Sequence, residues 1–226
     1  GIMGMLQLMQ DTPLDQEQQE YLEMAYTATK RLNRLLNDIL DLSKVESGKI
    51  EIREEAFHLG EVVQAIEDIF THTARKNGNR LRIRIDDRIP ERLIGDSTRL
   101  TQILINLAGN ADKFTQQGRV EVQADLLSAP KGEEVRVLFT VSDTGRGIPE
   151  DKLERVFETF TQADNRGSPY TREFEGAGLG LPLVKRLVQL MRGSSSIVSR
   201  AGEGTVVYLS LPFKLPQSMQ PAWTTT

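Results

Sequence analysis

The chain has 226 residues, of which 38% are hydrophobic and 27% charged, and its formal net charge is −4. This length allows one or two domains with a real core, and the negative charge argues against a general nucleic-acid binder. Because there is no cysteine, disulfides and cysteine-ligated zinc are excluded. No apolar run approaches the roughly 20 residues that a membrane span needs, so we expect no direct membrane contact.

Two helices are predicted first. Residues 1–9 carry their apolar side chains on one face, and Pro13 interrupts this pattern. A long helix is predicted from about residue 16 to about residue 44, because its apolar positions follow alternating intervals of four and three. These positions are Tyr21, Ala25, Ala28, Leu32, Leu35, Ile39 and Leu42. Such a heptad seam favours a dimeric four-helix bundle made from two hairpins, and packing on the chain's own second domain is the alternative.

Composition and period change after Gly48, which is typical of a helix C-terminus. We predict a helical hairpin over 1–48, a linker over 49–56, a second domain over 57–214 and a C-terminal linker over 215–226. The second domain has about five strands and three helices. The helices are expected at 59–76, from the N-cap Asp96 to Gly118, and at 179–191; the strands are expected at 81–85, 120–126, 135–141, 196–199 and 205–211. Hairpin connections predict an α+β fold rather than a doubly wound parallel sheet.

The helix that follows Asp96 has two faces. One is an apolar stripe, and the other carries Asn106, Asn110 and Lys113 at intervals of four and three. A carboxamide oxygen can coordinate Mg²⁺, and a lysine can hold a phosphate. A solvated polar margin beside a core helix is the alternative interpretation.

Two glycine-containing stretches could shape a ligand site. Asp143-Thr-Gly145-Arg-Gly147-Ile-Pro149 follows a strand, so its carboxylate could accept a hydrogen bond from an amine while glycine lets the backbone approach closely. Gly176-Ala-Gly178-Leu-Gly180 precedes a helix, where free N–H groups can face a phosphate. Each pattern alone is also common in ordinary turns. Neither a Rossmann fingerprint nor a Walker sequence is present.

The segment between these stretches contains Phe157-Glu-Thr-Phe160 and a polar run from Thr161 to Glu175. The two aromatic residues could pack in the core or anchor a mobile loop. A loop of about 15 residues inside a compact domain is usually functional or disordered. We therefore expect a mobile or functional loop in this segment.

In this order, the stretches resemble the ATP-binding domain of sensor histidine kinases, in the superfamily shared with type II topoisomerases, heat-shock chaperone ATPases and mismatch-repair ATPases. Residues 106–115 resemble the N box of this family, and residues 143–149 resemble its first glycine box. Residues 157–162 resemble the F box, and residues 176–181 the second glycine box. Gly202-Glu-Gly204-Thr205 resembles the last glycine-containing turn, and residues 36–48 resemble the end of the dimerisation and histidine-phosphotransfer hairpin. The resemblance covers about residues 1–213 and is closest to hybrid sensor kinases.

The resemblance implies a helical hairpin followed by an α/β sandwich that binds ATP and Mg²⁺. Asn110 would coordinate the metal, Lys113 would contact the phosphates and Asp143 would accept a hydrogen bond from the adenine amine. The implied cofactor-binding residues are Asn106, Asn110, Lys113, Asp143, Gly145, Gly147, Ile148, Phe160, Gly176, Gly178, Leu179, Gly180 and Thr205. The resemblance also implies that residues 161–177 form the ATP lid. Arg146 departs from the family pattern, in which an apolar residue is commoner, and the lid is a few residues longer than usual.

The implied activity is transfer of the ATP γ-phosphoryl group to a histidine and then to a response-regulator aspartate. Hydrolytic relatives carry a glutamate at the place of Asn106, and an amide cannot act as a general base. The phosphate-accepting histidine is expected upstream of Gly1, so the chain alone should not autophosphorylate; His58 and His72 match no family motif. The alternative is a nucleotide-gated dimerisation module without kinase activity.

The resemblance also implies partners and a location. We expect a homodimer formed through the hairpin and a response-regulator receiver domain as the second partner. No nucleic-acid partner is expected. The implied location is cytoplasmic, within a parent sensor of a class that can be anchored in a membrane.

Overall fold

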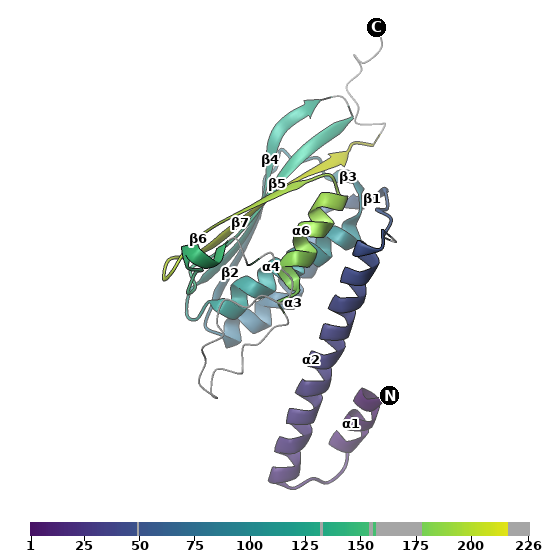
Figure 1. The fold of residues 1–226 in the computed structure, drawn as a ribbon, viewed down its shortest axis with the longest axis vertical. Coiled ribbons are helices and arrows are strands. Elements are labelled where there is room, and N and C mark those ends of the chain that lie inside the picture. The colour runs from purple at the N-terminus through teal and green to yellow at the C-terminus, as the bar shows by residue number, and fades with distance from the viewer. Residues whose placement is uncertain (49, 132, 154–155, 157–177, 217–226) are drawn as a thin grey trace. The chain divides into compact units, whose positions relative to one another are not determined.

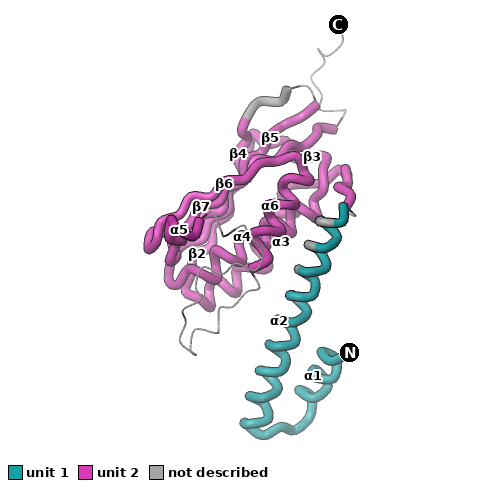
Figure 2. The backbone as a smooth tube through the Cα atoms, in the orientation of Figure 1, with its two compact units in different colours: residues 1–49 teal, residues 50–226 magenta. Residues whose placement is uncertain are grey.

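The computed structural model describes residues 1–48, 50–131, 133–153, 156 and 178–216. The chain divides into two compact units, Gly1–Lys49 and Ile50–Thr226 (Figure 2). None of the helices in these ranges combines the length and the apolar character that crossing a bilayer would require.

The first unit is a pair of helices, α1 (Ile2–Gln10) and α2 (Gln16–Glu46). A capping box starts α2: the Asp15 carboxylate accepts a hydrogen bond from the Gln18 backbone N–H at 2.8 Å, and the Gln18 side-chain oxygen accepts one from the Asp15 N–H at 3.1 Å. This reciprocal arrangement satisfies two N–H groups that a helix N-terminus otherwise leaves unpaired. The predicted helical hairpin is therefore present.

Two stripes run along α2, and only one of them is covered within the unit. Leu22 is 5% exposed, Tyr26 and Thr29 are half-buried, and the Asn33 amide nitrogen lies 3.3 Å from the Met3 sulfur of α1. These positions follow intervals of four, three and four, which places them on one helical face.

The heptad seam lies on the neighbouring face and is mostly exposed, although Leu35 is half-buried. Tyr21 is 61% exposed, Leu32 53% and Ile39 46%. The Leu42 side chain lies outside the described part of the structure. A row of large apolar side chains at heptad spacing is the surface that a partner helix usually covers.

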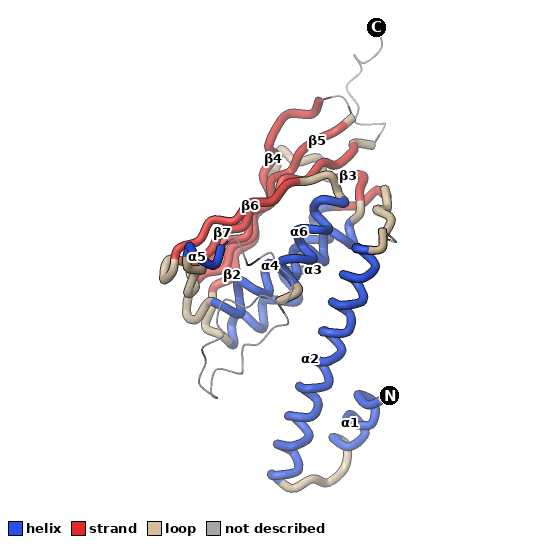
Figure 3. The backbone as a smooth tube through the Cα atoms, in the orientation of Figure 1, coloured by secondary structure: helices blue, strands red, loops and turns tan. Residues whose placement is uncertain are grey.

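The second unit is built on a seven-stranded sheet with the order β1-β3-β7-β5-β4-β2, and β6 also pairs with β7 (Figure 3). The strands are β1 (Glu55–His58), β2 (Arg80–Ile85), β3 (Arg92–Gly95), β4 (Arg119–Lys131), β5 (Glu134–Asp143), β6 (Ser194–Arg200) and β7 (Gly204–Lys214). The β2–β4 pair is parallel and the other pairs are antiparallel. The prediction of about five strands was too low, because β1 and β3 are four-residue strands that pair mainly with each other.

Helices cover one face of this sheet (Figure 1). They are α3 (Leu59–Lys76), α4 (Ser97–Phe114) and α6 (Gly180–Leu190), and a short α5 (Glu150–Leu153) follows β5. Alternate residues of β5, from Val135 to Val141, are buried together with the apolar stripe of α4 and the inner face of α6. This period-two burial is expected for a sheet with one covered face. The predicted α+β sandwich is confirmed.

The ends of α4 are fixed by two buried polar side chains. The Asp96 carboxylate accepts hydrogen bonds from the backbone N–H groups of Arg99 at 2.9 Å and Arg53 at 3.0 Å, as the predicted N-cap requires. At the other end, the helix stops at Phe114 rather than at Gly118, because Thr115 is already extended. The Asn79 amide, 5% exposed, donates to the last carbonyl oxygens of this turn, which are the groups a helix C-terminus leaves unpaired.

Candidate functional site

A polar row crosses the sheet at the point where its buried core ends. In the sheet register Asp143 of β5 lies opposite Thr205 of β7, and Thr205 lies opposite Ser199 of β6. The register pair two residues along the same strands, Val141 and Val207, is buried under the helices. Because side chains two residues apart share a face, the three polar side chains continue the helix-covered face of the sheet.

Ser199 is the central hydrogen-bonding residue of this row. Its hydroxyl oxygen accepts a hydrogen bond from the Ile148 backbone N–H at 2.8 Å and donates one to the Gly204 carbonyl oxygen at 2.7 Å. The Thr205 hydroxyl oxygen lies 2.9 Å away. One side chain thus connects the first glycine stretch with the last glycine-containing turn. The sequence analysis did not select Ser199, although its inward register on a strand marks it as a polar residue on a core-facing side.

Several donors surround Asp143. The Gly145 backbone N–H donates to its carboxylate at 2.8 Å. Burial, the largest effect, raises the pKa of Asp143, while the backbone N–H groups of Gly145 and Thr205 and the Thr115 hydroxyl lower it. The Thr115 hydroxyl oxygen is buried and forms no hydrogen bond of standard geometry with the residues the structure describes. The result is a partly desolvated acceptor, which suits recognition of an N–H donor.

Two glycines allow the backbone to close tightly around Asp143. Gly147 has a φ of +63°, and a Cβ at this position would lie 1.9 Å from the Arg200 carbonyl oxygen. Gly204 has a φ of +103°, and a Cβ there would lie 2.0 Å from the Asp143 carbonyl oxygen. The Gly202 N–H also donates to the Arg146 carbonyl oxygen at 2.7 Å. Only glycine fits such a combination of positive φ and backbone contact.

The start of α6 lies against the polar margin of α4. A Cβ built on Gly180 would lie 3.2 Å from the Asn106 Oδ1 atom and 3.8 Å from the Asn110 Nδ2 atom. Asn106 is 8% exposed and its amide donates to the Gln102 carbonyl oxygen at 3.0 Å, whereas Asn110 is half-buried. The structure therefore brings both predicted asparagines to the second glycine stretch, at a helix N-terminus whose dipole favours an anion.

Two cations contact one aromatic ring at the C-terminal end of α4. The Lys113 Nζ atom lies 4.7 Å from the centroid of the Phe114 ring, and the Arg146 guanidinium carbon lies 4.6 Å from it. The Arg146 backbone N–H also donates to the Phe114 carbonyl oxygen at 3.2 Å. Cation–π contact of this kind accounts for a cationic residue at position 146.

The four remaining predicted cofactor-binding residues fall into two groups. Gly178 and Leu179 directly precede α6, where Leu179 is 1% exposed. Phe160 and Gly176 lie outside the described residues, as do the whole predicted lid (161–177) and the whole F box (157–162).

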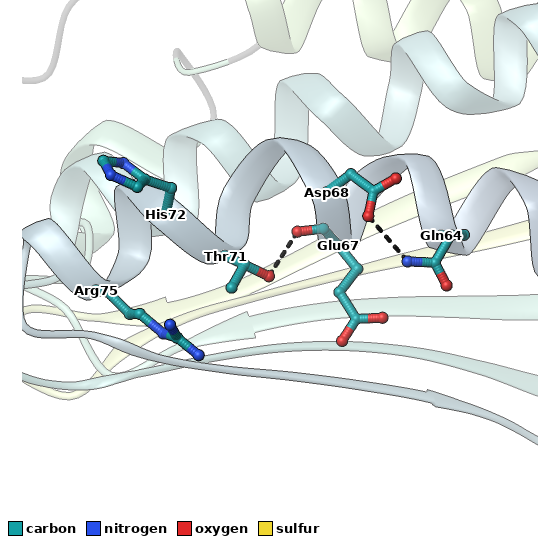
Figure 4. A pocket seen from close by; sticks show the side chains of 6 residues that line it. All are labelled: Gln64, Glu67, Asp68, Thr71, His72 and Arg75. Carbon is teal, nitrogen blue, oxygen red and sulfur yellow. Dashed lines mark hydrogen bonds between the residues drawn. The ribbon is translucent and has the colours of Figure 1, made fainter.

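The two histidines lie away from these residues. His58 is the N-cap residue of α3, with its Nδ1 atom 3.8 Å from a carboxylate oxygen of Glu91. His72 lines a shallow hollow on the exposed face of α3 (Figure 4). The hollow is lined by Gln64, Glu67, Asp68, Thr71, His72 and Arg75. Within the described ranges, no group of three or more histidine, cysteine, aspartate or glutamate side chains could hold a metal ion.

Comparisons with known proteins identify both units. Residues 95–215 match the family described as histidine kinase-, DNA gyrase B-, and HSP90-like ATPase, and residues 1–48 match the His Kinase A (phospho-acceptor) domain. The chain is 39% identical to the autoinducer 2 sensor kinase/phosphatase LuxQ of Vibrio vulnificus, covering 94% of this chain and 24% of that protein. It is 36% identical to the sensory/regulatory protein RpfC of Xanthomonas campestris, covering 97% of this chain and 30% of that one.

A solved structure supports the same family assignment. Full-length ShkA in complex with AMPPNP matches with a TM-score of 0.77 and 32% identity, over 95% of this chain and 43% of that one. Compared with LuxQ and RpfC, the chain spans about a quarter to a third of the length of each curated relative. The family matches and this complex indicate a nucleotide-binding domain, and they confirm the resemblance inferred from the sequence. The chain therefore belongs to the histidine kinase family, with a His Kinase A helical unit followed by a histidine kinase-, DNA gyrase B-, and HSP90-like ATPase domain.

Proposed function

We propose that the chain is the ATP-binding catalytic core of a sensor kinase, which transfers the γ-phosphoryl group of ATP to a histidine and from there to a response-regulator aspartate. The observation that carries this proposal is the meeting of distant segments around α4. Arg146 is hydrogen-bonded to the end of this helix at Phe114, and Gly180 lies against Asn106 and Asn110 near its middle. One helix thus contacts both glycine stretches.

The base would bind at the Asp143 end of the site. A carboxylate that already accepts a hydrogen bond from the Gly145 backbone N–H at 2.8 Å is held in one orientation. It retains lone pairs for the exocyclic amine of adenine. Gly147 and Ile148 would form one wall of the base site beside the Asp143 carboxylate. The hydrogen bond from the Ile148 N–H to the Ser199 hydroxyl holds this backbone in place.

The phosphates would bind at the start of α6. Backbone N–H groups of residues 178–180 and the Lys113 ammonium would contact them, and Asn110 would coordinate Mg²⁺ through its carboxamide oxygen. One carboxamide oxygen fits this ion, because Mg²⁺ takes oxygen ligands and commonly keeps water and phosphate oxygens as most of them. When bound, Mg²⁺ would neutralise phosphate charge during transfer.

Asn106 favours phosphoryl transfer over hydrolysis. Its amide is held by the Gln102 carbonyl oxygen, and its oxygen faces Gly180. A carboxamide at this place cannot remove a proton from water at neutral pH. We therefore expect slow steady-state release of inorganic phosphate from ATP, and rapid release would contradict this part of the proposal.

We also propose two protein partners. The exposed heptad seam of α2 would pair with a second copy of the chain, giving a four-helix bundle. The residues that match the His Kinase A domain contain no histidine, so the acceptor histidine would come from outside residues 1–48. A receiver domain would take the phosphoryl group next, as the kinase/phosphatase LuxQ and the sensory/regulatory protein RpfC suggest by similarity.

Isothermal titration of the chain with AMPPNP and Mg²⁺ tests the binding site. Asp143→Asn should weaken binding by about tenfold or more, because it replaces a charged acceptor with an amide. Asp125→Asn is the matched control: Asp125 lies on β4 and pairs with Arg84 at 2.9 Å, away from the polar row. Equal affinities for the wild type and Asp143→Asn would contradict the proposed base site.

A further inference from the structure

The hydroxyl groups of Ser199 and Thr205 have a defined direction of hydrogen bonding. A serine hydroxyl has one proton to donate and two lone pairs that can accept. Ser199 makes three contacts within hydrogen-bond distance, to the Ile148 N–H, the Gly204 carbonyl oxygen and the Thr205 hydroxyl. The Ile148 N–H is a donor, and the Gly204 carbonyl oxygen is an acceptor.

These partners leave one assignment for the third contact. The proton of Ser199 goes to the Gly204 carbonyl oxygen, because a carbonyl cannot donate. One lone pair accepts from the Ile148 N–H. Two hydroxyl oxygens 2.9 Å apart need a proton between them, so the Thr205 hydroxyl must donate to the remaining lone pair of Ser199.

This assignment determines what Thr205 can offer to a ligand. Its only hydroxyl proton is used on Ser199, so the oxygen retains lone pairs alone. Because Asp143 and Thr205 face each other in the register of β5 and β7, two acceptors stand side by side at the end of the site.

We propose that Ser199 is a positioning residue, which orients the Thr205 hydroxyl as an acceptor and so makes the site prefer a purine with an exocyclic 6-amine. This inference rests on the proposed nucleotide binding at Asp143. An amine brings two N–H donors, and two neighbouring acceptors can satisfy both, directly or through a water. A purine with a 6-oxo group, or with no 6-substituent, lacks these donors.

The test compares two nucleotides on several variants by isothermal titration. The nucleotides are AMPPNP and the same triphosphate analogue of purine riboside, which lacks the 6-amine. The measured quantity is the ratio of their dissociation constants. In Ser199→Ala the Thr205 hydroxyl is free to rotate, so we expect the preference for the 6-amine to fall by about fivefold, the usual effect of one net hydrogen bond.

Further variants separate positioning from a general loss of structure. Ser199→Thr keeps the hydroxyl and should retain the preference. Thr205→Val removes the oriented acceptor and should reduce the preference about as much as Ser199→Ala does, and the double variant should reduce it no further than either alone. Ser196→Ala is the matched control, since Ser196 is an exposed serine on the same strand, and it should leave both affinities unchanged.

The outcomes distinguish the inference from the proposed function. Equal weakening of both nucleotides in Ser199→Ala and in Thr205→Val would assign these residues a purely structural role and overturn the inference. An unchanged preference in Ser199→Ala would overturn it as well, whatever the result for Thr205→Val. Failure of the wild-type chain to bind AMPPNP would instead contradict the proposed function, and the inference with it. Circular dichroism of each variant checks the fold, and Thr205→Val decides the question if Ser199→Ala does not fold.

Discussion

The two units of the chain use their apolar residues in opposite ways. In the second unit, Phe139, Leu104 and Leu187 are fully buried between the sheet and its helices. In the first unit, large apolar side chains such as Tyr21 and Leu32 are more than half exposed. Burial of apolar surface is the main force that stabilises a fold. The second unit therefore has a hydrophobic core of its own, whereas many large apolar side chains of the hairpin are exposed to solvent.

This difference fits the different functions that we propose for the two units. Nucleotide recognition depends on fixed positions, and the proposed site lies where a closely packed sheet positions Asp143, Thr205 and Ser199. Association depends on an accessible surface, and the seam of α2 offers one. Three predictions test this division, beginning with the largest expected effect.

Gly147→Ala should destabilise the second unit strongly. A Cβ at this position would lie 1.9 Å from the Arg200 carbonyl oxygen, in a backbone conformation with a φ of +63°. The positive φ and the displacement of neighbouring backbone together should lower the free energy of unfolding by about 4 kcal/mol. Urea denaturation followed by circular dichroism measures this change, and nucleotide binding should be lost with it.

Gly202→Ala is the control for that variant. Gly202 also has a positive φ, +82°, but a Cβ there would have no atom within 4 Å. Only the backbone strain then applies, and we expect a loss of about 1 kcal/mol. Similar losses for the two variants would show that the close packing around Asp143 contributes little to stability.

Ile39→Lys should weaken self-association while leaving the second unit folded. Ile39 is 46% exposed on the heptad seam of α2. A lysine at a buried seam position in both copies should raise the dimer dissociation constant by about 100-fold, or about 3 kcal/mol. Analytical ultracentrifugation measures the dissociation constant. Thr27→Lys, at an exposed α2 position off the seam, should leave it unchanged; an equal effect of both variants would contradict a seam interface.

The smallest effect concerns the pH dependence of stability. Because burial raises the pKa of Asp143 above its usual value of 3.8, the unfolded chain ionises first as the pH rises. The folded state therefore binds more protons in this interval, and the contribution of Asp143 to the free energy of unfolding falls from pH 3.8 up to its folded pKa, then stays constant. Asp143→Asn should remove this slope. Urea denaturation at several pH values measures it, and parallel pH profiles would contradict the raised pKa.

Periodicity in the sequence was sufficient to predict the large elements. The helix predicted at 59–76 matches α3, and the alternating strand at 81–85 lies within β2. Periodicity did not predict β1 and β3, because a four-residue strand has too few alternating positions to recognise. Each of these strands forms through pairing with the other, which is distant in the sequence. The prediction also placed the end of α4 at Gly118, because nothing local to that helix indicates that Asn79, in the loop between α3 and β2, donates a hydrogen bond to the Thr115 carbonyl oxygen.

The candidate site shows the same limit at the level of single side chains. The sequence alone determined the order of the boxes and the faces of the helix carrying Asn106 and Asn110, because both follow from local spacing along the chain. Only the tertiary structure decided that Gly180 meets these asparagines and that Ser199 joins Ile148, Gly204 and Thr205. Local spacing specifies the face on which a side chain lies, but its hydrogen-bond partners are set by strand register and packing between segments far apart in the sequence.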